Sequence, residues 1–337
     1  MAQRKHVIMS VHDPLCNSEP DLNPAGGHRR HNTPSKKVIL RDGRSLSYIE
    51  KGVPKEESKY KVIVVHGFDS SKDMNFVAPE DLMKELGVYL VLYDRAGYGE
   101  SDPNPNRTQN SEASDIEELA DRIKIGPKFY LISNSMGSYP TWGCLKRIPN
   151  RLLGVAMVVP PVNYQWPSMP DILSKKDGRK RIYRAMILIG KYAPWLGHWW
   201  AARNPSRNDK NYSDRDRDLM KNAPNGHHSP TMEKLKDKSV FNNLSSDFRA
   251  SFSKWDFDPL EMKDPFPEKK GWMQIWQGCQ DKFINVELQR YVSRRLPWVR
   301  YYEVPDGGHC LVYDVAICES IFRALLLGDD PHKFRPF

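Results

Sequence analysis

The stretch FYLISNSMGS, residues 129–138, decides the fold of this chain. Its first half is apolar and aromatic, which is typical of a strand buried in a sheet. The run ends at small residues, and a helical pattern begins just beyond Gly137. A serine at the tip of such a strand, turn and helix projects from the carboxyl edge of the sheet, beside the free N–H groups of the starting helix. We therefore predict that Ser135 is a nucleophile.

This turn departs from the usual pattern at one position. A nucleophile of this kind is normally flanked by glycines two positions before and two positions after it. Gly137 supplies the second glycine, but Ser133 stands in place of the first. Because serine is among the smallest side chains, we expect a strained turn that still works. A lowered rate, or a site adapted to another reaction, is the alternative interpretation.

Outward from this stretch, apolar strand-like runs alternate with helical patterns. The strand-like runs lie at residues 60–65, 88–93, 129–134, 153–159, 272–276 and 299–304, and the helical ones include 74–86, 286–296 and 316–327. A capping box at 114–117 predicts the start of a further helix. Asp42-Gly43 predicts a β-hairpin turn before this series. The alternation predicts an α/β fold with a mostly parallel central sheet flanked by helices, whose ligand site lies at the carboxyl ends of the strands.

The alternation stops between residues 160 and 267, which are rich in proline, tryptophan and charge. We interpret this segment as an inserted helical cap, or lid, on a core formed by residues 36–159 and 268–330. Residues 1–35 are expected to be a disordered basic tail. The basic, aromatic run at 181–200 has the composition of an interfacial helix as well as of a cap helix, and we favour the cap.

Composition narrows the class of protein. The chain has 337 residues and a formal charge of +9, but no recognisable nucleic-acid motif, so we predict no nucleic-acid partner. Five scattered cysteines without a Cys-x-x-Cys pair indicate reduced thiols. The absence of a long uncharged apolar run or a signal-peptide pattern predicts a soluble, cytoplasmic protein without stable membrane insertion. The oligomeric state stays open.

Three polar residues follow three of the predicted strands, in the order Ser135, Asp281 and His309. A serine hydroxyl needs a base to take its proton, and a histidine with a near-neutral pKa can do this. The aspartate would hold the imidazole in the required tautomer. Three other acids compete for the last role, namely Asp256, Asp258 and Asp306.

A tetrahedral oxyanion also needs hydrogen-bond donors. The backbone N–H groups of Phe68 and Met136 are predicted to form this oxyanion hole from their positions after His66-Gly67 and after the nucleophile. Four side chains are candidates for the substrate pocket, namely Asp69, Asn134, Trp166 and Trp199. The tryptophans have packing of the cap onto the core as their alternative role. No cofactor or metal is predicted.

Taken together, these segments resemble the α/β-hydrolase superfamily. The resemblance is carried by HGF at 66–68, DRAGYGES at 94–101, the turn around Ser135, GCQD at 278–281 and GGH at 307–309. Segments 93–105, 254–260 and 296–301 look like a plant branch of that superfamily. The resemblance implies a cofactor-free serine hydrolase with a helical cap over the site. A serine in place of an aspartate nucleophile argues against the epoxide hydrolase and haloalkane dehalogenase branches.

The sequence thus predicts hydrolysis of a carboxylic ester of a small or medium apolar molecule through an acyl-serine intermediate. Two alternatives stay open, since a fold does not determine a reaction. The same residues could serve an acyltransferase or lyase. The protein could also be a small-molecule receptor with little turnover.

Overall fold

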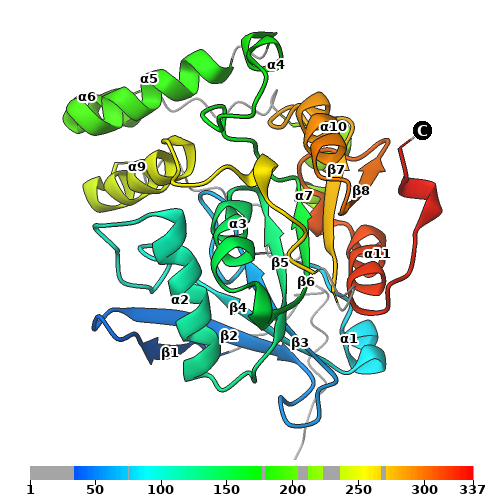
Figure 1. Ribbon diagram of the computed structural model, residues 1–337. Coiled ribbons are helices and arrows are strands. Elements are labelled where there is room, and N and C mark those ends of the chain that lie inside the picture. Colours follow the sequence, from blue (N-terminus) through cyan, green and yellow to red (C-terminus); the bar gives the residue numbers. More distant parts are fainter. Residues whose placement is uncertain are drawn as a thin grey trace, which may run out of the picture. The chain divides into compact units, whose positions relative to one another are not determined.

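Strands from across the chain join in one sheet in the computed structural model, which describes residues 34–74, 76–176, 179–203, 212–222, 236–266 and 271–336 (Figure 1). The strands are β1 (Lys36–Ile39), β2 (Ser45–Gly52), β3 (Tyr60–Val65), β4 (Val88–Tyr93), β5 (Phe129–Asn134), β6 (Leu152–Val158), β7 (Met273–Gly278) and β8 (Val299–Val304). They are ordered β1-β2-β4-β3-β5-β6-β7-β8. β1 pairs with β2 and β2 pairs with β4 antiparallel, and the neighbours from β4 to β8 pair parallel.

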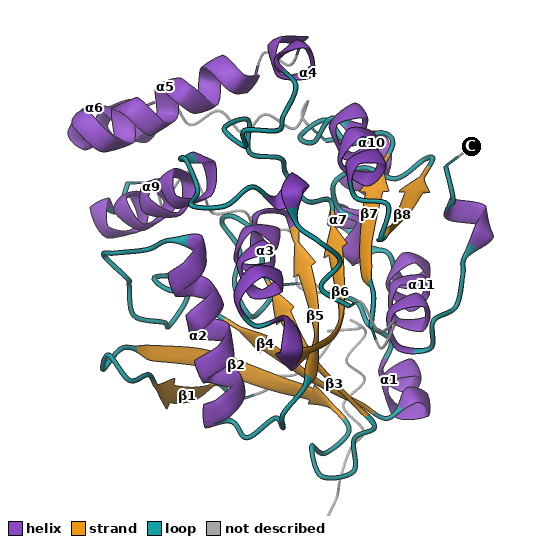
Figure 2. Ribbon diagram, in the orientation of Figure 1, coloured by secondary structure: helices purple, strands orange, loops and turns teal. Residues whose placement is uncertain are grey.

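The central strands are apolar because helices cover both of their faces. All six residues of β4 are buried, as are the last four of β3. One face packs against α2 (Gln109–Arg122), α3 (Ser138–Arg147) and α10 (Val286–Arg295). The other face packs against α1 (Glu80–Leu86) and α11 (Val315–Leu326). Figure 2 shows these helices on the two sides of the strands. The α/β-hydrolase fold expected from the sequence is therefore observed.

Helices also occupy the described parts of the chain between β6 and β7. They are α4 (Asp171–Lys176), α5 (Arg179–Tyr192), α6 (Pro194–Arg203), α7 (Asp214–Lys221) and α9 (Lys238–Phe252). Short 3-10 turns complete the fold at Ser135–Gly137, Pro149–Arg151, Pro259–Glu261, Leu311–Tyr313 and His332–Phe334. The α-helices between β6 and β7 lie within the predicted cap segment, of which the described residues 160–170 and 253–258 are not helical, and the cap itself stays a prediction.

Three local predictions need correction. The helix predicted at 74–86 begins only at Glu80. The helix predicted to begin at 114–117 begins earlier, because Thr108 caps it and forms the capping box with Ser111. The run at 181–200 is divided between α5 and α6, since Pro194 cannot continue the first helix. The hairpin at Asp42-Gly43 is confirmed. The prediction of a disordered tail lies outside the described residues.

Candidate active site

Ser135 lies at a sharp turn between β5 and α3. Its φ of +49° is in the left-handed region that side chains rarely adopt. Neighbouring backbone approaches Gly137 so closely that a glycine is needed there, and Gly67 leaves little room for a side chain. A Cβ at Gly137 would lie 2.4 Å from the carbonyl oxygen of Val65, and one at Gly67 would lie 3.1 Å from the Cβ of Ser135. The turn therefore holds the serine out from the end of β5.

The structure brings together the three residues that follow β5, β7 and β8. Ser135 Oγ lies 3.1 Å from His309 Nε2, and His309 Nδ1 lies 2.8 Å from Asp281 Oδ2. Because a carboxylate only accepts, Nδ1 carries the proton of the neutral imidazole and Nε2 is free to accept from the serine. This is the arrangement a general base needs.

Local contacts hold Asp281 in place. Its Oδ1 accepts the backbone N–H groups of Phe283 and Ile284 at 2.7 and 2.9 Å, and its side chain is fully buried. Gln277 Nε2 donates to Oδ2 at 3.3 Å. These contacts orient the carboxylate independently of His309.

The competing acids make other contacts. Asp256 accepts from Asn110, Asp258 accepts from the N–H groups of Ser168 and Leu260, and Asp306 pairs with Arg215. Of the four candidate acids, Asp281 is the one hydrogen-bonded to the imidazole.

The surroundings of His309 favour its charged form. Burial lowers the pKa of the imidazole, but the charge and hydrogen bond of Asp281, together with the charge of Asp216, outweigh burial and raise the pKa above its ordinary value. A strengthened base opposite a serine hydroxyl suits proton transfer.

The predicted oxyanion donors occupy suitable backbone positions. Met136 is the second residue of the 3-10 turn, so its N–H belongs to the first turn, where helical partners are lacking. Phe68 follows Gly67, which packs directly against Ser135. Its ring contacts Phe248 of α9, with 6.3 Å between ring centroids. The role of both amides in binding an oxyanion stays a prediction.

The four predicted pocket residues lie in different parts of the fold. Asn134 directly precedes the serine, and Asp69 has a left-handed φ of +50° in the loop after β3. Trp166 is 3% exposed and packs between Trp142 and Trp255 in the core. Trp199 is half exposed on α6. Core packing thus accounts for Trp166, and substrate contact by any of the four stays a prediction.

His66, which also follows a strand, has both ring nitrogens engaged. Its Nε2 accepts the backbone N–H of Arg95 at 3.0 Å, so Nδ1 carries the proton and donates to the Gly67 carbonyl at 2.8 Å. Burial, followed by the charge of Arg95, lowers the pKa of His66 well below its ordinary value. Through these contacts the His66 imidazole connects the loops after β3 and β4, which explains a structural role for it.

One residue beside the site has no signal in the sequence. Asp216 of α7 is fully buried, and its carboxylate accepts the backbone N–H groups of His309 and Cys310 at 3.0 and 2.8 Å. Its approach requires Gly308, because a Cβ there would lie 2.0 Å from Asp216 Oδ2. Asp216 is 93 positions away from His309 along the chain, which is why local patterns miss it.

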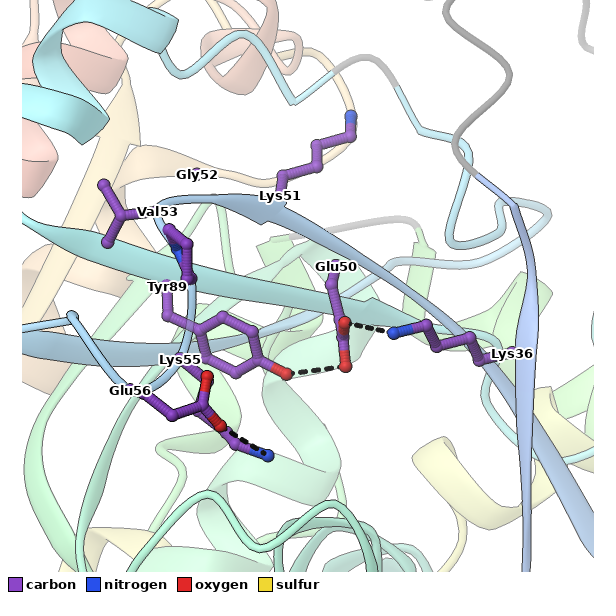
Figure 3. A pocket seen from close by; sticks show the side chains of 9 residues that line it. Lys36, Glu50, Lys51, Gly52, Val53, Lys55, Glu56 and Tyr89 are labelled. Carbon is purple, nitrogen blue, oxygen red and sulfur yellow. Dashed lines mark hydrogen bonds and ion pairs between the residues drawn. The ribbon is translucent and has the colours of Figure 1, made fainter.

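A groove of about 460 Å³ lies at the other edge of the sheet (Figure 3). It lies at the amino end of β4, where Tyr89 pairs with Gly52, whereas Ser135 follows the carboxyl end of β5. Within the groove, Glu50 accepts from both Lys36 and Tyr89, and Lys55 pairs with Glu56. Nothing in this groove resembles the chemistry around Ser135.

In the described part of the chain, no three His, Cys, Asp or Glu side chains are grouped so that they could hold a metal ion. None of the described helices is long and apolar enough to cross a bilayer.

An open, mostly parallel sheet with a serine at a left-handed strand-to-helix turn, facing a histidine from a later strand end, defines the class of α/β hydrolases. The chain belongs to the alpha/beta hydrolase family, whose model matches residues 62–316. A search of curated protein sequences found no match.

Solved structures share the fold at low sequence identity. The enol-lactonase from Burkholderia xenovorans LB400 is 14% identical, with a TM-score of 0.60 over 86% of this chain and 97% of its own. An esterase from Exiguobacterium antarcticum is 18% identical, with a TM-score of 0.56 over 82% and 93%. A thermophilic esterase from Thermogutta terrifontis is also 18% identical, with a TM-score of 0.51 over 86% and 95%.

Proposed function

We propose that this protein is a serine hydrolase that cleaves a carboxylic ester of a small or medium apolar molecule. The observation that carries the proposal is the continuous chain of contacts from Ser135 through His309 to Asp281, at 3.1 and 2.8 Å. Membership of the family and the esterase and lactonase neighbours support the same chemistry. The finer resemblance to a plant branch stays a prediction.

In this proposal, His309 Nε2 takes the proton of Ser135 as Oγ attacks the ester carbonyl. Asp281 stabilises the imidazolium that forms. His309 then gives the proton to the leaving alcohol, and an acyl-serine remains. Water, deprotonated by His309, attacks the acyl group and releases the acid, with the proton returned to Ser135.

The negative charge of each tetrahedral intermediate needs fixed donors. The N–H groups of Phe68 and Met136 are our candidates, because Gly67 brings the first of these loops against Ser135. One such donor is worth about 3 kcal/mol of transition-state stabilisation in enzymes of this type.

Covalent labelling tests the nucleophile and the reaction together. The wild-type protein and Ser135→Ala are each treated with a fluorophosphonate probe and assayed with a series of aryl esters of increasing acyl length. We expect probe labelling and turnover in the wild type only, with the fastest turnover on short or medium chains. Ala in place of Ser removes the nucleophile but leaves the surrounding packing intact.

If the wild type neither labels nor turns over above Ser135→Ala, the hydrolase proposal is wrong. Calorimetric screening for ligand binding without turnover then tests the receptor alternative. Turnover that requires an acceptor alcohol in place of water would instead indicate an acyltransferase.

A further inference from the structure

Helix α7, which belongs to the insertion, contacts both loops that carry the proposed base and acid. Besides its bonds to His309 and Cys310, the Asp216 carboxylate accepts the N–H of Ser213 at 3.1 Å. Arg215 pairs with Asp306 and Asp314, which lie on either side of His309 in the chain. The loop that follows β8 is thus held at its centre by a buried carboxylate and at its flanks by an arginine.

The residues just before α7 reach the loop that carries Asp281. Lys282 Nζ donates to the carbonyl of Tyr212 at 3.1 Å. The Tyr212 ring packs on Phe283, and Phe283 packs on the imidazole of His309, with 4.9 and 5.0 Å between the ring centroids. One short segment therefore joins the two loops whose relative position sets the contact between His309 and Asp281.

We propose that Asp216 is a positioning residue of the active site, which places the His309 backbone and adds negative charge beside its imidazole. This inference rests on the proposed function. The inserted segment, which the sequence predicts to be a cap over the site, would then also position a residue of the proposed catalytic machinery. A buried carboxylate that accepts N–H groups from two consecutive residues restricts the height and tilt of that backbone, and a misplacement of about 1 Å can cost about 100-fold in rate.

The charged groups described around His309 come from two segments, the loop after β7 and helix α7. Asp281 lies at Nδ1 and Asp216 at the backbone N–H, while Arg215 and Lys282 lie at the edges of the two loops and pair with other groups. The buried thiol of Cys310 has a pKa raised by burial first and then by the charge of Asp216, so it stays neutral. Asp216 is therefore a source of negative charge that a neutral variant would remove.

Asp216→Asn tests the inference, with Asp218→Asn as the matched control on the exposed side of the same helix. The amide keeps the shape of the carboxylate but accepts at one atom only. We expect kcat on an aryl ester to fall on the order of 100-fold, with little change in KM. We also expect the acidic limb of the kcat/KM profile to move to lower pH, because the pKa of His309 falls. Asp218→Asn should match the wild type.

A folded Asp216→Asn protein with unchanged kcat and an unchanged acidic limb overturns the inference, provided that the wild type shows Ser135-dependent turnover. Absent turnover in the wild type would instead overturn the proposed function. If Asp216→Asn does not fold, Asp216→Glu takes its place. It keeps the charge but shifts the carboxylate by one methylene relative to the N–H groups of His309 and Cys310, so a lower kcat at unchanged KM supports the inference and an unchanged kcat overturns it.

A second, independent observation concerns α5 and α6, which contact α9 and lie outside it (Figure 1). Towards α9, Tyr183 and Ile187 pack on the core, and Gly197 approaches Phe241. Other apolar side chains of the two helices are exposed. We call this set the α5–α6 face, and it consists of Ile182, Met186, Leu188, Ile189, Tyr192, Trp195 and Leu196.

The charge of these helices is entirely basic. Residues 179–203 contain six lysines and arginines and no acidic residue. Arg181, Arg184 and Lys191 are exposed beside the apolar side chains. Exposed aromatic and aliphatic groups combined with clustered basic groups match the two layers of an anionic membrane surface, which presents phosphate oxygens above acyl chains.

We propose that the α5–α6 face docks on the surface of an anionic phospholipid bilayer, with both helices in the plane of the interface. An aqueous environment would leave a large apolar patch exposed, which is uncommon in a monomer. A charged protein surface could match the basic groups but would offer no place for Trp195 and Tyr192, which are 70% exposed.

Vesicle sedimentation tests the docking. The full chain is mixed with vesicles of phosphatidylcholine alone and of phosphatidylcholine with phosphatidylserine. We expect binding to the second kind only, weakened by salt. Reversal of the basic groups in Arg181→Glu/Arg184→Glu/Lys191→Glu should weaken partitioning on the order of 100-fold. Lys128→Glu/Lys146→Glu/Arg147→Glu changes the net charge equally at exposed sites elsewhere and should bind far better than the face variant.

Three outcomes overturn the docking proposal. The first is no binding of the wild type to anionic vesicles, and the second is equal weakening by the two charge-reversal variants. The third is concentration-dependent self-association in analytical ultracentrifugation that Ile182→Gln/Met186→Gln/Trp195→Gln abolishes, since a second copy of the chain would then occupy the face.

Discussion

Ser135 and Ser133 lie two positions apart in β5 and its turn. Ser135 has a strained backbone, whereas Ser133 has a buried hydroxyl without a hydrogen-bond partner among the described residues. The left-handed φ of +49° falls on Ser135, which has a side chain and therefore stores strain. Ser133 is fully buried at the end of β5, where it pairs with Val65 and Met157. Within the described part of the chain, its hydroxyl has no hydrogen-bond partner. The cost of a serine in place of glycine at position 133 is thus a buried hydroxyl that the described residues leave unpaired. The expected backbone strain lies at Ser135 instead.

Replacement of Ser133 by alanine should therefore stabilise the fold. Removal of a buried, unsatisfied hydroxyl is expected to raise the free energy of unfolding by about 1 kcal/mol, with kcat unchanged, as measured by urea denaturation and ester turnover. Ser47→Ala is the matched control, since Ser47 is equally buried but donates to Glu100 at 2.9 Å, so its loss should destabilise. A destabilised Ser133→Ala would contradict this account.

The pKa of His309 predicts the pH dependence of the proposed reaction. A general base must be neutral, so kcat/KM should rise with pH through a midpoint above the ordinary histidine value of about 6.5. Asp281→Asn removes the nearby charge and the acceptor, so the midpoint should move down and kcat should fall by about 10⁴-fold. The pH profiles of wild type and variant measure both effects. Asp256→Asn is the control, and a loss of turnover there would mean that the acid is assigned wrongly.

At the scale of the element, helix α2 shows how a local signal can be misplaced. Ser114 to Glu117 match a capping box by sequence, but the helix already begins at Gln109 behind Thr108. The Thr108 side chain accepts the N–H of Ser111 at 3.0 Å, while the Ser114 hydroxyl donates to the Asn110 carbonyl inside the helix. Both segments have the right composition, and packing of the helix on the sheet selects the longer one.

This difference makes a paired prediction. Thr108→Ala should lower the free energy of unfolding by about 1 kcal/mol, since it removes the cap. Ser114→Ala should change stability little, because alanine is the better residue within a helix. Thermal and urea denaturation of the two variants compare them directly. Equal losses would place the start of the helix nearer to Ser114.

At the scale of the whole molecule, a buried ionic network joins the insertion to the body. Asp247 of α9 accepts from Arg95 at 2.6 and 2.9 Å, and from the Tyr98 hydroxyl at 2.5 Å. Glu112 of α2 pairs with Arg95 on its other side. Burial would raise the pKa of Asp247, but the charges of Arg95 and Arg107 outweigh it and hold the pKa below its usual range.

Asp247→Ala should therefore destabilise the whole fold. Buried Arg95 loses its bidentate carboxylate partner and keeps only Glu112, and loss of one member of such a buried pair costs about 3–5 kcal/mol. The depressed pKa means that the ionised Asp247 stabilises the fold above the unfolded pKa of about 3.9, and that this contribution is lost as the pH falls below it. Urea denaturation should show the gap between wild type and variant narrowing in acid.

Lys238→Ala, at an exposed position of the same helix, is the control for Asp247→Ala and should be neutral. A neutral Asp247→Ala would show that packing alone holds α9 against the body.

Local chemistry explains why so much of the sheet and of the site could be predicted. β3, β4 and β8 occur at the residues expected, because apolar β-branched runs bounded by turn residues mark buried strands. The order of Ser135, Asp281 and His309 follows from their positions directly after strands. Since parallel strands end at one edge of the sheet, their loops meet there.

By itself, the sequence determined the strand series and the turn at Ser135, because each depends on neighbours within a few positions. It also predicted the three residues that meet beyond the sheet, because each follows a strand of one parallel series. Only the tertiary structure decided that Asp216 binds the backbone of His309 and that Asp247 pairs with Arg95. These contacts join residues 93 and 152 positions apart. A buried carboxylate looks like any surface aspartate in a sequence, because its partners are assembled only when the inserted helices pack onto the sheet.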